Sequence, residues 1–200
     1  MNRYCFLIKG SSINMLGLQE PYIIKDSHLS ISKGKFDEPC IEKTKTGITA
    51  IELPKHLDKY TISAWVYLYK LDNWQYVFHH VWLNNDEMIY YYKDDTSHNG
   101  YSLAKVTKNK LIHVYVAVDQ NKQEFYVDGI KFSNDKYTQN LKTFYLLGVL
   151  GYEAFEGKIS DVCIFDDYVP FNGIPNKPLS VIPPNVLYIT KNNNVFKVGD

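Results

Sequence analysis

Long apolar runs, an excess of charge and paired cysteines are all scarce in this 200-residue chain. No apolar run approaches the ~20 residues that a membrane-spanning helix needs, so we expect no membrane insertion. Basic and acidic residues each number 22, and this balance argues against binding to nucleic acid. Cys5, Cys40 and Cys163 lie far apart without CxxC spacing, which is neither a disulfide framework nor a zinc site.

The N-terminus lacks the apolar core of a signal peptide, because the run YCFLI at residues 4–8 is too short. We therefore expect the protein to stay in the cytosol where it is made, or to leave it without a signal. Arginine is nearly absent: 21 of the 22 basic residues are lysines. This composition is typical of an AT-rich genome and favours a low-GC bacterium or one of its viruses.

Motifs of catalysis are missing as well. The sequence contains no P-loop, no dinucleotide-binding glycine motif, no zinc-protease motif and no nucleophile elbow. Asp86 and Glu87 are adjacent, so in a strand they would point to opposite faces and could not act as a glycosidase pair. The same geometry prevents His79 and His80 from chelating one ion alone. We expect no catalytic residues and no enzymatic activity.

Alternating strands are what the sequence does contain. In residues 61–69 one face of the predicted strand is aliphatic and the other is aromatic and polar. The first face carries Ile62, Ala64, Val66 and Leu68, and the second carries Thr61, Ser63, Trp65, Tyr67 and Tyr69. This pattern is typical of a strand with one side packed on a second sheet.

Further strands are predicted at regular spacing. After residue 50, no segment shows a 3.6-residue period of apolar residues over the length of a helix. They cover residues 75–82, 87–92, 101–106, 110–119, 123–127, 130–132, 143–150 and 158–165. Asp128-Gly129 predicts a two-residue hairpin turn, because a type I′ turn needs positive φ at both positions. The fold class is therefore all-β, a two-sheet antiparallel sandwich or jelly roll.

The C-terminal part differs in composition. Residues 169–184 hold five of the eight prolines, which predicts an extended surface arm. Residues 186–190 and 195–198 then predict a terminal hairpin. We divide the chain into a sandwich domain, 1–168, and this arm with its hairpin, 169–200. The arm either docks the domain onto an assembly, with Val186, Tyr188 and Phe196 as assembly candidates, or folds back onto its own sandwich.

Loops and aromatic residues supply the ligand-binding candidates. An aromatic side chain beside amide and carboxylate side chains is an arrangement that binds sugars. The glycan-binding candidates of this kind are Asp72, Asn73, Trp74, Tyr91, His98 and Asn99. Asp94 and Asp95 offer oxygen ligands that calcium prefers, although solvated turn residues explain them equally well. We expect no other cofactor.

Three segments, in order, resemble the laminin G-like branch of the concanavalin A-like lectin/glucanase superfamily. Residues 61–70 are similar to its strand with an alternating S-x-W core, and residues 111–132 to its strand, turn and D-G hairpin, where His113 matches a usual histidine. Residues 147–167 resemble its closing strand. There Phe155, Gly157, Ile159, Asp161 and Val162 match, and Cys163 takes the place of arginine.

The resemblance implies a two-sheet antiparallel jelly roll that serves as a binding module. Together with the composition and the arm, it favours a non-enzymatic structural or attachment protein of a bacteriophage particle, made in the host cytoplasm and located in the virion. Its partners would be other virion proteins, copies of itself in a homo-oligomer, or a cell-surface glycan. The alternative is a free carbohydrate-binding lectin or a degenerate glycoside hydrolase of the same fold.

Overall fold

The computed structural model describes most of the chain, and its described part consists of strands, turns and extended segments. The described residues are 3–9, 12–16, 22–23, 29–36, 39–43, 49–71, 75–78, 81–91, 102–119, 122–133, 141–146, 153–165, 167–176, 186–189 and 195–198. They contain no helix, and so none that is long and apolar enough to cross a membrane.

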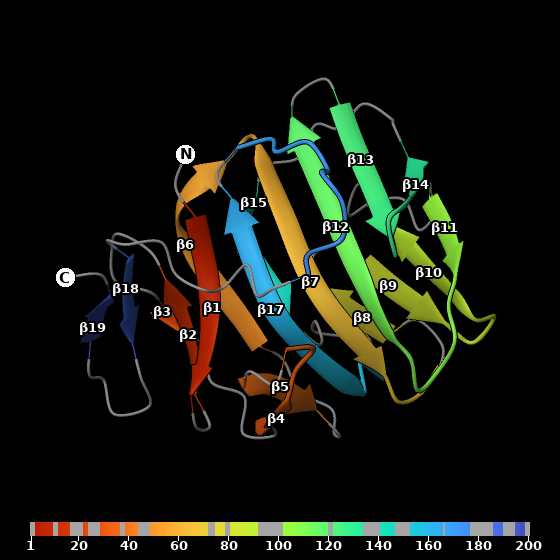
Figure 1. The fold of residues 1–200 in the computed structure, drawn as a ribbon, viewed down its shortest axis with the longest axis horizontal. Helices are drawn as coiled ribbons and strands as arrows, with labels where there is room; N and C mark the ends of the chain where they lie inside the picture. The colour runs from red at the N-terminus through yellow and green to blue at the C-terminus, as the bar shows by residue number, and fades with distance from the viewer. Residues whose placement is uncertain are drawn as a thin grey trace.

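One layer of the molecule is a nine-stranded antiparallel sheet (Figure 1). Its strands are β14 (Ile130–Ser133), β13 (Lys122–Val127), β12 (Leu111–Asp119), β7 (Tyr60–Leu68), β17 (Gly157–Phe165), β1 (Arg3–Lys9) and β2 (Ser12–Leu16) in spatial order, with β5 (Pro39–Lys43) and β4 (Leu29–Lys33) branching from β17. Segments from both halves of the chain therefore lie side by side at its centre.

The second layer is an eight-stranded sheet. It runs in the order β11 (Ser102–Lys105), β10 (Met88–Tyr91), β9 (Val81–Asn84), β8 (Gln75–Phe78), β15 (Leu141–Leu146), β6 (Thr49–Leu57) and β3 (Tyr22–Ile23), with β16 (Glu153–Ala154) paired to β8. Its pairs are antiparallel except β16 with β8. The predicted all-β, two-sheet antiparallel sandwich is confirmed.

The core lies between the two sheets, and β7 supplies its centre. Ile62, Ala64, Val66 and Leu68 are all fully buried there, as the alternation predicts. On the facing sheet the ring of Tyr91 stacks on Phe125, with centroids 5.2 Å apart and planes 19° from parallel. Burial of these side chains is the main favourable contribution to folding, at about 25 cal/mol per Å² of apolar area.

The single strand predicted over residues 75–82 is wrong, because this stretch forms two strands. β8 and β9 pair antiparallel, with Tyr76 opposite Trp82 and Phe78 opposite Val81. The alternating apolar pattern does not predict two strands, because neither glycine, proline nor asparagine occurs between residues 75 and 82. His79 and His80, and the prediction about their side chains, lie outside the described residues.

Two backbone features on the nine-stranded sheet match the sequence closely. Asp128 and Gly129 connect β13 to β14 with φ of 48° and 82°, which confirms the predicted hairpin turn. In β17, Asp161 has φ of 48°, and the register with β7 shifts between Ser160 and Cys163. Asp161 thus sits in a β-bulge that lets Ile159 and Val162 both face the core.

The predicted terminal hairpin is also present, as β18 (Val186–Ile189) paired with β19 (Val195–Val198). Val186 lies opposite Val198, and Tyr188 lies opposite Phe196. The hairpin forms a separate two-stranded sheet whose strand β18 lies beside β2 (Figure 1).

Candidate binding face

The outer face of the nine-stranded sheet gathers aromatic and polar side chains. Because side chains alternate along a strand, the buried aliphatic face of β7 leaves Ser63, Trp65 and Tyr67 on the other side. The register then places His113 of β12 opposite Trp65, and Tyr115 opposite Ser63. The result is a continuous aromatic and polar surface across β17, β7, β12 and β13.

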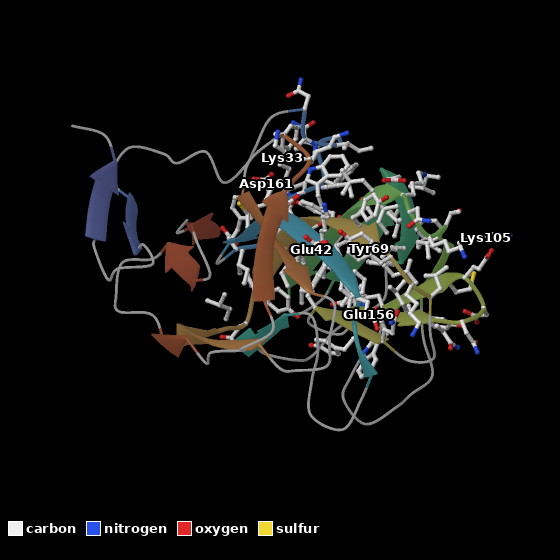
Figure 2. The ribbon with its side chains drawn as sticks, turned by 90° about the horizontal axis from the view of Figure 1, so that it is seen from below. Lys33, Glu42, Tyr69, Lys105, Glu156 and Asp161 are labelled. Carbon is white, nitrogen blue, oxygen red and sulfur yellow. The ribbon has the colours of Figure 1, made fainter. Side chains whose placement is uncertain are left out.

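One end of this surface is half-exposed. The rings of Tyr67 and Tyr69 meet edge to face, with centroids 5.3 Å apart. The hydroxyl of Tyr69 donates a hydrogen bond to the carboxylate of Glu42, and both residues are labelled in Figure 2. The ammonium of Lys158 lies 6.0 Å from the ring centre of Tyr67 and 5.9 Å from that of Tyr69. We call these four residues the Tyr67–Tyr69 site; their side chains are partly open to solvent.

The centre of the same face is buried. His113 is fully buried, and its Nε2 lies 2.9 Å from the hydroxyl of Ser63. Burial lowers the pKa of His113 to about 4, against the opposing effect of the Asp128 carboxylate, so the ring is neutral at pH 7. Trp65 packs against this ring at 5.0 Å between centroids.

Ser63 and His113 resemble part of a catalytic triad, but no acid among the described residues is bonded to the imidazole ring. The carboxylate of Asp128 accepts a hydrogen bond from the backbone N–H of His113 at 2.9 Å and from the ammonium of Lys110 at 3.0 Å. It therefore does not orient the imidazole ring, which is the role of the acid in a triad. Ser63 is also buried, so no substrate reaches its hydroxyl in this conformation.

Residues 167–176, which we call the strap, cross the outer face over β7 and β12 (Figure 1). Thr61 binds the strap twice: its hydroxyl donates to the carbonyl of Asp167 at 2.9 Å and accepts from the N–H of Val169 at 2.8 Å. The hydroxyl of Tyr115 donates to the carbonyl of Val169 at 2.7 Å. The first part of the predicted arm is thus extended and packs on the outer face of the sheet.

Aromatic contacts hold the strap further along. Phe171 stacks on Tyr126 with centroids 4.3 Å apart, and it meets Tyr115 at 5.1 Å and His113 at 6.3 Å. On the other side of Trp65, the ring of Phe36 lies 6.0 Å away and the ammonium of Lys35 lies 4.8 Å from the Trp65 ring. The buried centre of the face is therefore covered from two sides by segments outside the sheet.

Glu124 anchors the start of the strap to β13. Its carboxylate accepts hydrogen bonds from the hydroxyl of Tyr168 at 2.6 Å and from Lys131 at 2.5 Å, and Lys122 lies 3.0 Å away. Burial alone would raise the pKa of Glu124, but these donors outweigh it and lower the pKa to about 2. Lys122 also lies 4.8 Å from the centre of the Tyr168 ring.

Glu42 and Glu124 are too far apart to act as a pair. Glu42 lies on β5 and Glu124 on β13, with β17, β7 and β12 between them. Four strand spacings of about 4.8 Å give at least about 19 Å across the sheet. The paired carboxylates of glycoside hydrolases lie about 5–10 Å apart, so these two side chains do not form such a site.

The structure corrects the prediction for Tyr91. Its side chain is fully buried between the sheets, because Ile89 and Tyr91 face inward on β10 while Met88 and Tyr90 face outward. It is a core residue. The other glycan-binding candidates, Asp72, Asn73, Trp74, His98 and Asn99, and the calcium candidates Asp94 and Asp95 lie outside the described residues.

Sequence reasoning missed Glu42, Lys158 and the strap as parts of the outer face. The one signal of this site in the sequence is the alternation over residues 61–69, which places Tyr67 and Tyr69 together on the aromatic face of the predicted strand. Glu42 reaches them because β5 pairs with β17, which in turn pairs with β7. Among the described residues, no group of three or more histidine, cysteine, aspartate or glutamate side chains is arranged to hold a metal.

The fold agrees with the comparisons to known proteins. The family model described as "Concanavalin A-like lectin/glucanases superfamily" matches residues 43–169, more than half of the chain. The chain therefore belongs to this laminin G-like family of the superfamily. No curated protein matches the sequence.

Solved structures share the fold at low sequence identity. Domain 4 of AbnA, a GH43 extracellular arabinanase from Geobacillus stearothermophilus, solved with arabinotriose, has a TM-score of 0.54 and 15% identity, and the match covers 75% of this chain and 84% of that one. Trypanosoma rangeli sialidase with the inhibitor DANA has a TM-score of 0.61 and 9% identity over 84% of this chain. The botulinum neurotoxin type G receptor binding domain has a TM-score of 0.61 and 10% identity over 84%. The match spans 31% of the sialidase chain and 48% of the neurotoxin domain.

Proposed function

We propose that this protein is a non-catalytic carbohydrate-binding module and that it binds glycans at the Tyr67–Tyr69 site. The observation that carries the proposal is the pair of half-exposed tyrosine rings flanked by a carboxylate and an ammonium group on the outer face of the sheet. Binding sites for small molecules combine an apolar or aromatic surface with a few convergent polar groups, and this site has both.

Each group has a distinct role in the proposed contact. The tyrosine rings offer flat apolar surfaces against which the C–H face of a sugar ring packs. The carboxylate of Glu42 accepts hydrogen bonds from sugar hydroxyls, and Lys158 donates them. Because the Tyr69 hydroxyl already donates to Glu42, ring and acid are held in a fixed relative position before a ligand arrives.

The non-catalytic part of the proposal rests on carboxylate spacing. Glycoside hydrolysis needs two carboxyl groups about 5–10 Å apart, whereas Glu42 and Glu124 on the outer face lie at least about 19 Å apart across the sheet. The superfamily includes both lectins and glucanases by its description, so fold alone does not decide between them. AbnA domain 4, solved with arabinotriose, is an example of a sugar complex on a similar fold.

Glycan binding is tested by screening the full chain against an oligosaccharide array that includes arabinotriose and sialylated sugars, followed by calorimetry on the hits. Tyr69→Ala and Glu42→Gln are each expected to weaken binding at least about tenfold, which is 1.4 kcal/mol. Tyr90→Ala, on the other sheet, is the matched control and should leave affinity unchanged. Equal affinity in all variants would overturn the site, and release of reducing sugar from a bound oligosaccharide would overturn the non-catalytic assignment.

We propose a bacteriophage particle as the setting of this module, with the virion as its location. The support is the lysine-rich, arginine-poor composition and the proline-rich segment that ends in the β18–β19 hairpin. In that setting the partners are other virion proteins or copies of the chain, and the glycan belongs to the host surface. Antibody labelling of purified particles tests this: absence of the protein from particles would leave the free lectin as the function.

A further inference from the structure

His113 lies at the contact between the strap and the sheet. Its ring is packed against Trp65 on β7, Tyr115 on its own strand and Phe171 on the strap. Its Nε2 pairs with Ser63, while its Nδ1 is buried with no hydrogen-bond partner. The ring is therefore held in its neutral form in a site that the strap closes.

Neither ring nitrogen of His113 is bonded to a carboxylate, because Nε2 pairs with Ser63 and Nδ1 has no hydrogen-bond partner. The charge of Asp128 favours a protonated ring, but its carboxylate is bonded to the backbone N–H of His113 and to Lys110. Glu124, on β13, is occupied by Tyr168 and two lysines. Lys35 lies over the Trp65 ring and adds a positive charge on that side. An imidazolium in this site would be buried and unpaired, which is strongly unfavourable.

We propose that the strap is an acid-released cover: protonation of His113 displaces the Phe171 end of the strap and uncovers the centre of the outer face. The strap is the element that can yield, because it is an extended segment held by side chains, whereas β7, β12 and β13 are paired strands in the sheet. Water reaching the ring would replace the missing partners of the imidazolium.

The direction of the pH effect follows from the two states of His113. The closed state has a pKa of about 4, and a hydrated histidine has one near 6.5, so the open state binds the proton more tightly. The closed state is therefore fully favoured above about pH 6.5 and loses stability as the pH falls towards 4. The closed-to-open ratio changes by at most about 300-fold across this window.

Glu124 sets where the strap opens. Its pKa of about 2 keeps the carboxylate ionised throughout the His113 window, so the Tyr168 end stays attached. Opening at Phe171 would uncover the rings that Phe171 contacts, which are those of His113, Tyr115 and Tyr126. These groups lie on the same outer face as the Tyr67–Tyr69 site, but the release itself needs no ligand and is measured without one.

The test is an NMR titration of the full chain from pH 8 to pH 3, following the His113 ring, the Phe171 ring in the strap and the amide of Val116 in β12. We expect the two rings to change together at one midpoint between pH 4 and 6.5, while Val116 stays protected. A His113 ring that titrates while Phe171 stays packed on Tyr126 would overturn the proposal.

Variants separate the switch from general acid unfolding. His113→Gln should remove the transition of the Phe171 ring in this window. Phe171→Ala weakens the strap contact and should raise the His113 midpoint towards 6.5, whereas Ile174→Ala, an exposed strap residue, is the matched control and should leave it unchanged. Should His113→Gln fail to fold, the Phe171→Ala and Ile174→Ala pair decides: equal midpoints in the two variants would reject the proposal.

Discussion

Glu124 shows how one buried charge is stabilised by partners from separate segments. Lys122 comes from its own strand, Lys131 from β14 and Tyr168 from the strap, and together they satisfy both carboxylate oxygens. An ion pair of this kind differs from Glu87 with Lys105, which is 3.9 Å long and well exposed to solvent. Exposed pairs contribute little, whereas removing one member of a buried network leaves the others without partners.

We predict that Glu124→Gln lowers the free energy of unfolding by about 1–3 kcal/mol at pH 7. Because the folded pKa of Glu124 is depressed to about 2, the contribution of the carboxylate is present above about pH 4.5 and is lost as the pH falls towards 2. Denaturant unfolding should therefore show that the free energy of unfolding falls less in the variant than in the wild type as the pH is lowered from about 4.5 towards 2. Glu87→Gln is the control, and an equal effect in both variants would contradict the prediction.

At the scale of the element, β17 explains why the family-like motif contains Phe155 and Gly157. A Cβ on Gly157 would lie 2.1 Å from the carbonyl oxygen of Tyr67 and 2.4 Å from the ring of Phe155. The close approach of β17 to β7 and the packing of Phe155 at the strand start thus both require glycine here. Gly173 in the strap differs, because it has φ of 94° but open space around it.

Gly157→Ala should therefore destabilise the sandwich by about 3 kcal/mol or more, through overpacking against backbone that cannot move without breaking the β7–β17 pairing. Gly173→Ala should cost only about 1–2 kcal/mol, the strain of a left-handed backbone with a Cβ. Thermal or chemical denaturation of the two variants checks the order. A Gly157→Ala protein as stable as Gly173→Ala would show that the sheet accommodates the added methyl group.

At the scale of the whole molecule, the strap joins the C-terminal segment to the sandwich. We predict that deleting residues 169–200 lowers the free energy of unfolding by several kcal/mol, since it removes the acceptor of the Tyr115 hydroxyl and exposes the ring of Tyr126. Deleting residues 177–200 keeps the strap and should cost much less.

Melting curves and sedimentation of both deletions provide the measurement. If the protein without residues 177–200 still folds but no longer assembles, this would support the predicted attachment role of β18 and β19. Equal stability of the two deletions would mean that the strap adds nothing to the sandwich, and so would contradict its role as a cover.

The sequence by itself determined the local features of this protein. Alternation along residues 61–69 was enough to predict which side of the strand faces the second sheet, because side-chain direction in a strand has a period of two. Asp128-Gly129 predicted its turn because few other pairs adopt positive φ at both positions. Both are properties of neighbouring residues, and both are confirmed.

Only the tertiary structure decided which distant residues meet. Glu42 joins Tyr69 across three paired strands, and the strap covers His113 although 54 residues separate Tyr115 from Val169. The sequence predicted Tyr91 as a glycan-binding residue, but in β10, paired with β9, its side chain faces the core. Strand order and the path of a segment over a sheet depend on long-range packing, and no local pattern of residues encodes them.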